Sequence, residues 1–328
     1  MNKKVVLIDG HSILNRAFYG VPVLTNSEGL HTNGIYGFLN IMFKVLDEEQ
    51  AEGLMVAFDL KAPTFRHKMY EAYKGTRKPM PQELHEQVPV LKEVLQSMGI
   101  PIVTKEGYEA DDILGTLSRL WEERGYEVTI ISGDRDLLQL ATEKVKISIP
   151  KTKAGGTQVE NYFAGDVLAA YQVTPTQFID LKALMGDTSD NIPGVPGIGE
   201  KTATKIIAAY GSIESAYEHV DEIKPARAAN NLREHYDMAV MSKKLAAIDT
   251  HAPIEVSDKL AGLEHMYSEA AYQMMKRLEF KNILNRFNQE EMAVPVLSAA
   301  REIRDENEQR QKIFEAMGQK LISLYPIC

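Results

Sequence analysis

Cysteine is almost absent from this chain of 328 residues, which carries only Cys328. One cysteine cannot form an internal disulfide, and its scarcity fits a reducing cytoplasm, where we expect the protein to act. Because no residue follows it, Cys328 cannot belong to a prenylation box. Long apolar runs are absent too, and the N-terminal VVLI is far too short for a signal peptide. We therefore expect neither a membrane span nor a membrane partner.

An excess of basic residues is also lacking. The chain has 37 Lys and Arg against 46 Asp and Glu, a formal net charge of −9, which taken alone argues against a nucleic-acid partner. Its length predicts two domains, or one large α/β domain with an appendage. With 44% apolar and 25% charged residues, such a chain can bury a substantial core.

The glycine-rich turn GVPGIG, residues 194–199, lacks both nucleotide-binding signatures. A P-loop ends in Gly-Lys-Ser/Thr, but Glu200 stands where the lysine should be and Lys201 comes one place late. A carboxylate at that place would repel phosphates. The dinucleotide pattern fails because Thr202 replaces its third glycine.

Two helical patterns flank this turn, at residues 174–187 and 200–211. The second helix is predicted to begin near Gly199, so that free backbone N–H groups lie beside Lys201. Such a helix start is an anion site suited to a backbone phosphate of nucleic acid. A helical hairpin turn without any ligand is the alternative, and the turn alone does not decide between them.

Three short apolar runs predict buried parallel strands, at residues 3–9, 53–59 and 127–136. Helical patterns at 34–48 and 84–99 separate them and are typical of crossover helices. The predicted fold class is α/β, with a central, mostly parallel sheet flanked by helices. Each run ends in a carboxylate, and ligands of such sheets bind outside the carboxyl ends of the strands. These carboxylates should therefore converge.

Nine acidic residues lie at the ends of predicted strands and helices. Each alone could be helix-dipole or turn chemistry. Together they would repel one another unless cations held them, and oxygen ligands without His or Cys select Mg²⁺ or Mn²⁺. Two such ions about 3.5–4 Å apart serve phosphodiester hydrolysis. Without these nine the chain is neutral overall, which leaves room for basic patches. The nine are Asp9, Asp59, Glu109, Asp111, Asp112, Asp134, Asp136, Asp187 and Asp190.

One basic patch is visible at residues 61–81, here called the basic segment. Aromatic residues interleave with its charges, an arrangement that suits single-stranded nucleic acid. A solvated basic helix with its aromatics packed inward is the alternative. The cations are Lys61, Arg66, Lys68, Lys74, Arg77 and Lys78, and the aromatics are Phe65, Tyr70 and Tyr73.

Six motifs, in order, resemble those of the bacterial 5′-nuclease (flap endonuclease) family, particularly the N-terminal 5′→3′ exonuclease domain of DNA polymerase I. The likeness runs from about residue 3 to about 287 and includes all nine acidic positions. It implies a PIN-like α/β fold with a helical arch and a C-terminal helix-hairpin-helix subdomain. The motifs are LIDGHSILNRAF, AFD, FRHKMYEAYKGTR, YEADDILGTL, ISGDRDLLQL and LMGDTSDNIPGVPGIGEKTA.

The resemblance also implies residue roles. Glu109, Asp111, Asp112 and Asp134 would surround one ion, Asp136, Asp187 and Asp190 the other, with Asp9 and Asp59 supporting the first partly through water. Tyr73, Lys74 and Arg77 would thread the strand and contact the scissile phosphate. The turn would bind duplex phosphates around a K⁺ ion. The implied DNA-binding residues are Arg16, Arg66, Lys68, Gly194, Gly197, Gly199, Lys201, Thr202 and Lys205.

Three regions follow from this reading: a nuclease core at 1–172, a helix-hairpin-helix subdomain at 173–288, and a tail at 289–328, predicted to be helical. About forty residues cannot encode the proofreading and polymerase domains that would follow in DNA polymerase I.

The expected function is two-metal, structure-specific hydrolysis of 5′-flap DNA or RNA primer ends by a monomer, with a DNA polymerase as an expected partner. Two alternatives remain at this stage. One is a non-catalytic binder of branched DNA. The other is a phosphatase-like hydrolase, which usually carries a D-x-D motif where LIDGHS supplies only Asp9.

Overall fold

The computed structural model describes residues 3–153, 156–257 and 262–287. By its contacts the chain divides into two units, Met1–Met266 and Tyr267–Cys328, which are described separately. The predicted helical tail at 289–328 lies outside the described residues.

A six-stranded sheet forms the centre of the first unit, in the order β3-β2-β1-β4-β5-β6. All neighbours are parallel except β5 and β6. The three predicted strands are confirmed as β1, β2 and β4, at the middle of the sheet. The other three strands were not predicted from the sequence. The strands are β1 (Lys4–Asp9), β2 (Gly53–Ala57), β3 (Ile102–Val103), β4 (Glu127–Ile131), β5 (Val145–Lys153) and β6 (Gly156–Tyr162).

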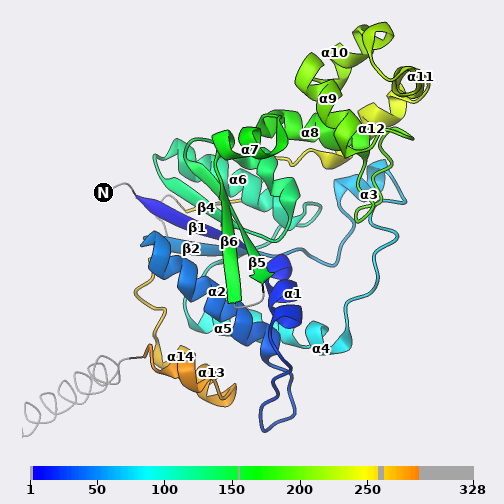
Figure 1. The fold of residues 1–328 in the computed structure, drawn as a ribbon. Helices are drawn as coiled ribbons and strands as arrows, with labels where there is room; N and C mark the ends of the chain where they lie inside the picture. Colours follow the sequence, from blue (N-terminus) through cyan, green and yellow to red (C-terminus); the bar gives the residue numbers. More distant parts are fainter. Residues whose placement is uncertain (1–2, 154–155, 258–261, 288–328) are drawn as a thin grey trace, which may run out of the picture. The chain divides into compact units, whose positions relative to one another are not determined.

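Helices cover both faces of this sheet (Figure 1). On one face α6 packs against β1, β2 and β4, where its fully buried Trp121 joins Val5 and Leu7 in the core. On the other face lie α2 and α5. Burial on both faces explains why the strands read as nearly continuous apolar runs. The helices are α1 (Gly10–Gly20), α2 (Asn33–Glu49), α3 (Phe65–Met69), α4 (Gln82–His85), α5 (Gln87–Ser97), α6 (Ala110–Glu123), the 3-10 helix η1 (Arg135–Leu140) and α7 (Ala164–Tyr171).

A helical region follows the sheet and begins at α8, whose start is fixed by Thr174. The Thr174 hydroxyl accepts a hydrogen bond from the backbone of Gln177, and Pro175 occupies the first turn, as expected of a helix start. α8 packs against α12, α9 and η1. Through η1 the helical region reaches the segment that follows β4. Its elements are α8 (Pro175–Met185), α9 (Glu200–Tyr210), α10 (Ile213–Glu218), the 3-10 helix η2 (Val220–Glu222), α11 (Ala226–Glu234) and α12 (Tyr236–Ala246).

The second unit contains α13 (Glu269–Arg277) and α14 (Lys281–Leu284). Ser268 caps α13, and the Phe287 ring packs edge-on against Tyr267 and tilted against Tyr272. Over all described residues, every helix falls short of the length and apolar character needed to cross a membrane.

Candidate active site

Acidic side chains meet at the carboxyl edge of the sheet, as the sequence predicts. Asp9 ends β1, Asp59 follows β2 by two residues, and Asp134 follows β4 by three. The register pairs Asp9 with Ala57, so the strands end at the same level. All three carboxylates line one groove, together with Asp111 from the start of α6.

Asp9 is held from two sides. Its carboxylate caps α1 by accepting a hydrogen bond from the Ser12 backbone N–H (3.0 Å), and it accepts another from the Ser132 hydroxyl (2.8 Å). The pKa of Asp9 is raised to about 6, chiefly by burial and also by the nearby charges of Asp59 and Asp134, against the lowering effect of its hydrogen bonds from Ser12 and Ser132. This carboxylate lies where negative charge is crowded.

Asp59 is oriented by His11, a residue that the sequence analysis did not single out. His11 Nδ1 lies 3.2 Å from one carboxylate oxygen, and the Ala110 backbone N–H donates to the other at 2.9 Å. Burial would raise the pKa of Asp59, but the hydrogen bonds from His11 and Ala110 lower it to about 2. The His-Asp pair therefore keeps this carboxylate ionised.

Asp111 and Asp112 take opposite directions at the start of α6. Burial raises the pKa of Asp111, as do the charges of Asp134 and Asp9, and Asp111 lines the groove with them. Asp112 is fully buried, and both of its oxygens accept hydrogen bonds from Arg66 at 2.8 Å. Both Asp112 oxygens are thus engaged in an internal ion pair in this structure, and the metal-binding role of Asp112 stays a prediction.

Arg66, the partner of Asp112, was predicted to bind DNA, but it is buried. Only 2% of its surface is exposed, and its guanidinium also donates to the backbone carbonyls of Leu245 (2.9 Å) and Ala247 (2.7 Å). An arginine so enclosed cannot contact a DNA strand. Its sequence position within the basic segment was misleading because one side of α3 faces inward.

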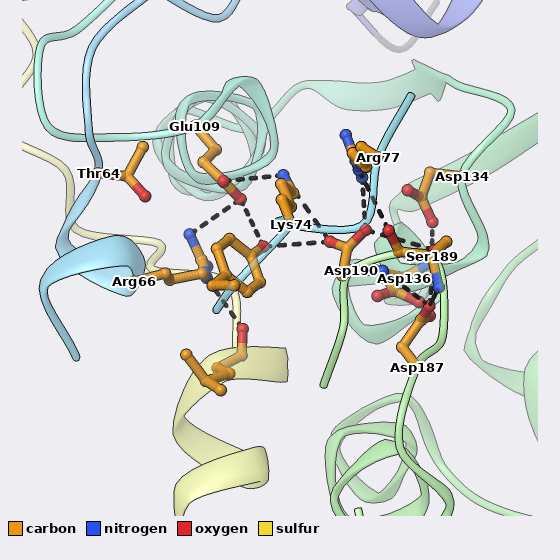
Figure 2. Close-up of polar contacts among 12 residues, drawn as sticks. Thr64, Arg66, Lys74, Arg77, Glu109, Asp134, Asp136, Asp187, Ser189 and Asp190 are labelled. Carbon is orange, nitrogen blue, oxygen red and sulfur yellow. Dashed lines mark hydrogen bonds and ion pairs between the residues drawn. The ribbon is translucent and has the colours of Figure 1, made fainter. Parts of the chain in front are cut away.

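The three residues predicted to act on the scissile phosphate contact Glu109 and Asp190 (Figure 2). They are Tyr73, Lys74 and Arg77. The buried Tyr73 hydroxyl donates to both carboxylates, at 3.0 and 3.1 Å. Lys74 Nζ lies 2.8 Å from Glu109 and 3.7 Å from Asp190, and Arg77 pairs with Asp190 at 2.5 Å. Burial would lower the pKa values of Lys74 and Arg77, but these carboxylates raise both. Both cations therefore stay charged beside the groove.

The backbone fixes Lys74 in this place. Its φ of 56° lies in the left-handed region, which is unfavourable for a residue with a side chain. The Lys74 N–H donates to the Asp190 carbonyl (2.8 Å), and the Asn191 amide donates to the Ala72 carbonyl (2.7 Å). The basic segment is thereby tied to the acidic loop after α8.

The aromatic residues of the basic segment do not offer their faces to unstacked bases. Tyr73 is buried, Tyr70 packs beside it in a small apolar cluster, and Phe65 is covered by the Arg66 guanidinium 4.5 Å from its ring centre. The alternative of inward-packed aromatics is the one the structure shows. Lys68 is exposed, as a backbone-contacting residue must be.

Asp136 and Asp187 share a lysine that the sequence analysis missed, Lys182. Its Nζ lies 2.6 Å from Asp136 and also pairs with Asp187. A signal was present in the sequence, because Lys182 occupies the apolar face of α8 between Phe178 and Met185. A lysine at such a position needs an acidic partner.

These residues fit a divalent cation, although basic side chains hold several of the carboxylates. Within the described ranges, no three acidic or histidine groups are arranged so that they would by themselves hold a metal ion. Lys74, Arg77 and Lys182 instead pair with carboxylates of the set. Within the part of the chain that the structure describes, Asp9 and Asp111 form no ion pair with Lys or Arg, and their raised pKa values reflect burial beside other acids. Crowded carboxylate oxygens are the ligands that Mg²⁺ and Mn²⁺ prefer.

The glycine-rich turn contains two kinds of glycine. Gly194 is buried with φ 62°, and its N–H donates to the Ser242 hydroxyl at 3.0 Å. A side chain there would lie 2.3 Å from the Gly186 nitrogen. This glycine permits a close backbone approach, which is a structural reason for its presence, and its DNA contact stays a prediction. Gly197 and Gly199 are exposed.

The start of α9 matches the predicted anion site more closely. Gly199 is its N-cap, and no side chain covers this position. Lys201 and Lys205 are both exposed one helical turn apart, with Thr202 half-buried between them. No described contact tests the implied K⁺ ion, which stays a prediction.

The groove extends along α1. A second hollow shares Ser12, Asn15 and Asp134 with the acidic groove and continues to Arg16 and Tyr19. Arg16 thus lies in a hollow that adjoins the acidic groove, and its contact with DNA stays a prediction.

Fold and site together define a resolvase-like α/β domain followed by a helical domain of SAM fold. Residues 4–172 match the family model of the 5′-3′ exonuclease N-terminal resolvase-like domain, and residues 173–269 match that of the 5′-3′ exonuclease C-terminal SAM fold. The chain therefore belongs to the 5′-3′ exonuclease family.

Known proteins agree with this assignment. DNA polymerase I of Bacillus caldotenax is 48% identical over 286 residues, which cover 87% of this chain and 32% of that protein. The chain thus spans about a third of the length of the curated relatives it matches. Among solved structures, the T5 D15 protein co-crystallised with metal ions has a TM-score of 0.63 at 23% identity, covering 84% of this chain and all of that one. The catalytic core of Rad2 in complex with DNA substrate has a TM-score of 0.53 at 15% identity, covering 88% and 93%.

Proposed function

We propose that the protein is a structure-specific 5′-3′ exonuclease and 5′-flap endonuclease that acts on branched DNA or RNA primer ends in replication and repair. One observation carries the proposal. Asp9, Asp111 and Asp134, which have no ion pair to Lys or Arg in the described parts of the chain, line one groove with Lys74 and Arg77. Crowded anions beside two fixed cations suit the hydrolysis of a phosphodiester.

In this proposal some of the acidic residues bind the metal ions, and others position basic side chains. Asp9, Asp59, Asp111 and Asp134 would hold one divalent ion, and Asp136 with Asp187 the other. When bound, two Mg²⁺ or Mn²⁺ ions would activate a water and offset the charge that develops on the phosphate. The co-crystallisation of the T5 D15 protein with metal ions supports this part of the proposal.

Glu109 and Asp190 have a different task in this proposal. Each accepts a hydrogen bond from Tyr73, and between them they hold Lys74 and Arg77. These two carboxylates would position the cations toward the scissile phosphate. A preorganised donor stabilises the charge of the transition state at little reorganisation cost.

Basic residues in two places would bind the substrate, and among them Arg16 is half-buried and the lysines are exposed. Arg16 and Lys68 would contact the strands near the acidic groove, while Lys201 and Lys205 at the start of α9 would contact duplex phosphates. The Rad2 core, of the same fold, was solved with DNA substrate, which supports the proposed class of ligand. A K⁺ ion at the glycine-rich turn, a monomeric state, a cytoplasmic location and a polymerase acting with the protein belong to this proposal.

The test is cleavage of a 5′-labelled flap oligonucleotide by the purified chain, with Mg²⁺, with Mn²⁺ and with excess chelator. We expect products ending in a 3′-hydroxyl with either ion and none in chelator. Tight flap binding without cleavage under all three conditions would favour a non-catalytic DNA-structure binder. Cleavage of small phosphoesters alone would favour a phosphatase.

A further inference from the structure

Lys182 is an internal cation at the acidic site. It lies in the last turn of α8, and only 10% of its side chain is exposed. Its ammonium contacts Asp136 at 2.6 Å and also contacts Asp187. Two carboxylates within ion-pair distance favour the charged form of this ammonium. A buried ammonium lodged between two carboxylates is a compact point charge in a place suited to a metal ion.

The two halves of the acidic site differ in how their charge is balanced. Asp9, Asp111 and Asp134 have no ion pair to a basic residue in the described ranges. Asp136 and Asp187, in contrast, share Lys182. In the described residues, the protein thus pairs a lysine directly with Asp136 and Asp187, whereas Asp9, Asp111 and Asp134 have no direct ion pair with a basic residue, although Lys74 and Arg77 line the same groove.

Asp187 does not depend on Lys182 alone for its orientation. One of its oxygens accepts hydrogen bonds from the Ser189 backbone N–H (2.7 Å) and hydroxyl (2.6 Å). Lys182 contacts the other oxygen. If the flexible lysine side chain moved away, this carboxylate would stay in place with a free oxygen.

We propose that Lys182 is a positioning residue that competes with the second divalent ion for Asp136 and Asp187. This inference rests on the proposed two-metal function and deepens it. In chelator the ammonium neutralises the pair. Binding of the second ion requires the Lys182 side chain to move away, so the second ion binds more weakly than the first. The free concentration of divalent ions then determines the fraction of the protein that holds both ions.

The test measures metal binding directly. Free Mn²⁺ is counted by electron paramagnetic resonance while it is added to the chelator-treated wild type, Lys182→Met, Lys182→Arg and Lys243→Met. Lys243 is the matched control, because it also bridges two carboxylates, Asp180 at 2.7 Å and Glu214 at 2.8 Å, away from the acidic groove.

For the wild type we expect one strong and one weaker Mn²⁺. Lys182→Met should strengthen the weaker one at least about tenfold, a modest share of what a unit charge within 4 Å exerts near a protein surface. The stronger ion should change little. Lys182→Arg, which keeps the charge, and Lys243→Met should both match the wild type. Equal isotherms for Lys182→Met and the wild type would overturn the inference.

The Met variant could fail to fold in chelator, since it leaves two carboxylates unpaired. In that case the metal titration is followed in the wild type by the ¹³C–¹⁵N NMR signal of the Lys182 side chain. This signal is assigned by its absence from the spectrum of Lys182→Arg. The signal should move as the second ion binds, and a signal unchanged up to saturation would contradict the inference. A wild type that binds no divalent ion would instead remove the proposed function itself.

Discussion

Arg66 and Asp112 form a two-pronged ion pair in the interior, with Nη1 and Nη2 each 2.8 Å from a carboxylate oxygen. The pair joins the basic segment to the start of α6, and the Asp249 backbone N–H donates to the same carboxylate at 2.9 Å. Arg66, predicted to bind DNA, and Asp112, predicted to bind metal, therefore form an internal ion pair that joins the elements carrying the site.

Removing either partner of this ion pair should lower the free energy of unfolding. Arg66→Ala leaves the Asp112 charge buried and unpaired, which typically costs about 3–5 kcal/mol of the free energy of unfolding. Urea titration followed by circular dichroism measures the change. The control is Lys68→Ala on the exposed side of the same helix, expected within about 0.5 kcal/mol of wild type. Equal stability of the two variants would show that the pair is not structural.

Lys74 should act on chemistry more than on binding. Its ammonium is held beside the groove by Glu109 and Asp190, so Lys74→Ala removes a preorganised donor. We expect single-turnover cleavage of bound flap DNA to slow by about 10²–10³. The DNA dissociation constant should change far less. Wild-type cleavage by Lys74→Ala at saturating enzyme would rule out a catalytic role.

Lys68 should show the opposite behaviour. Because it is exposed, its contact with the strand is screened by salt. Lys68→Ala should weaken binding slightly at low salt, leave the single-turnover rate unchanged, and lose its effect at high salt. Binding and rate are measured at two salt concentrations beside Lys74→Ala. An effect of Lys68→Ala that persists at high salt would contradict a screened contact.

Lys201 should contribute one phosphate contact. Lys201→Ala is expected to lower the slope of log affinity against log salt by up to about 1, and Lys201→Ala with Lys205→Ala by up to about 2, for any duplex sequence. Lys144→Ala is the control, because Lys144 is exposed at the opposite, amino edge of the sheet. Slopes that equal that of the control would make the turn purely structural.

Alanine substitutions at Gly194 and Gly199 should affect stability differently, because only Gly194 is required by the backbone geometry of the turn. Gly194→Ala meets a positive φ and a backbone nitrogen at 2.3 Å, so it should destabilise the fold by about 1–3 kcal/mol or more. Gly199 has φ −92° and open space, and Gly199→Ala at this N-cap should cost less than about 1 kcal/mol. Urea titration compares them, and the reverse order would be inconsistent with the turn as described.

The sequence predicted features that local chemistry determines. The central strands and the acids at their ends follow from apolar runs that stop in aspartate, and parallel pairing brings those acids together. Contacts across long sequence separations were not accessible in this way. Asp112 is 46 positions from Arg66, and Lys182 is 46 from Asp136, so neither partner could be assigned from spacing. The short strand β3 and the antiparallel β6 were likewise missed, since their pairing depends on the sheet already formed.

In the proposed function, the acidic site cleaves DNA and does not merely bind it. Asp136→Ala tests it most directly, with cleavage and binding of one 5′-flap substrate measured together in Mg²⁺. We expect cleavage to be lost while the variant binds the flap at least as tightly as the wild type does, because an anion near the phosphate has been removed. Cleavage by Asp136→Ala at the wild-type rate would contradict it.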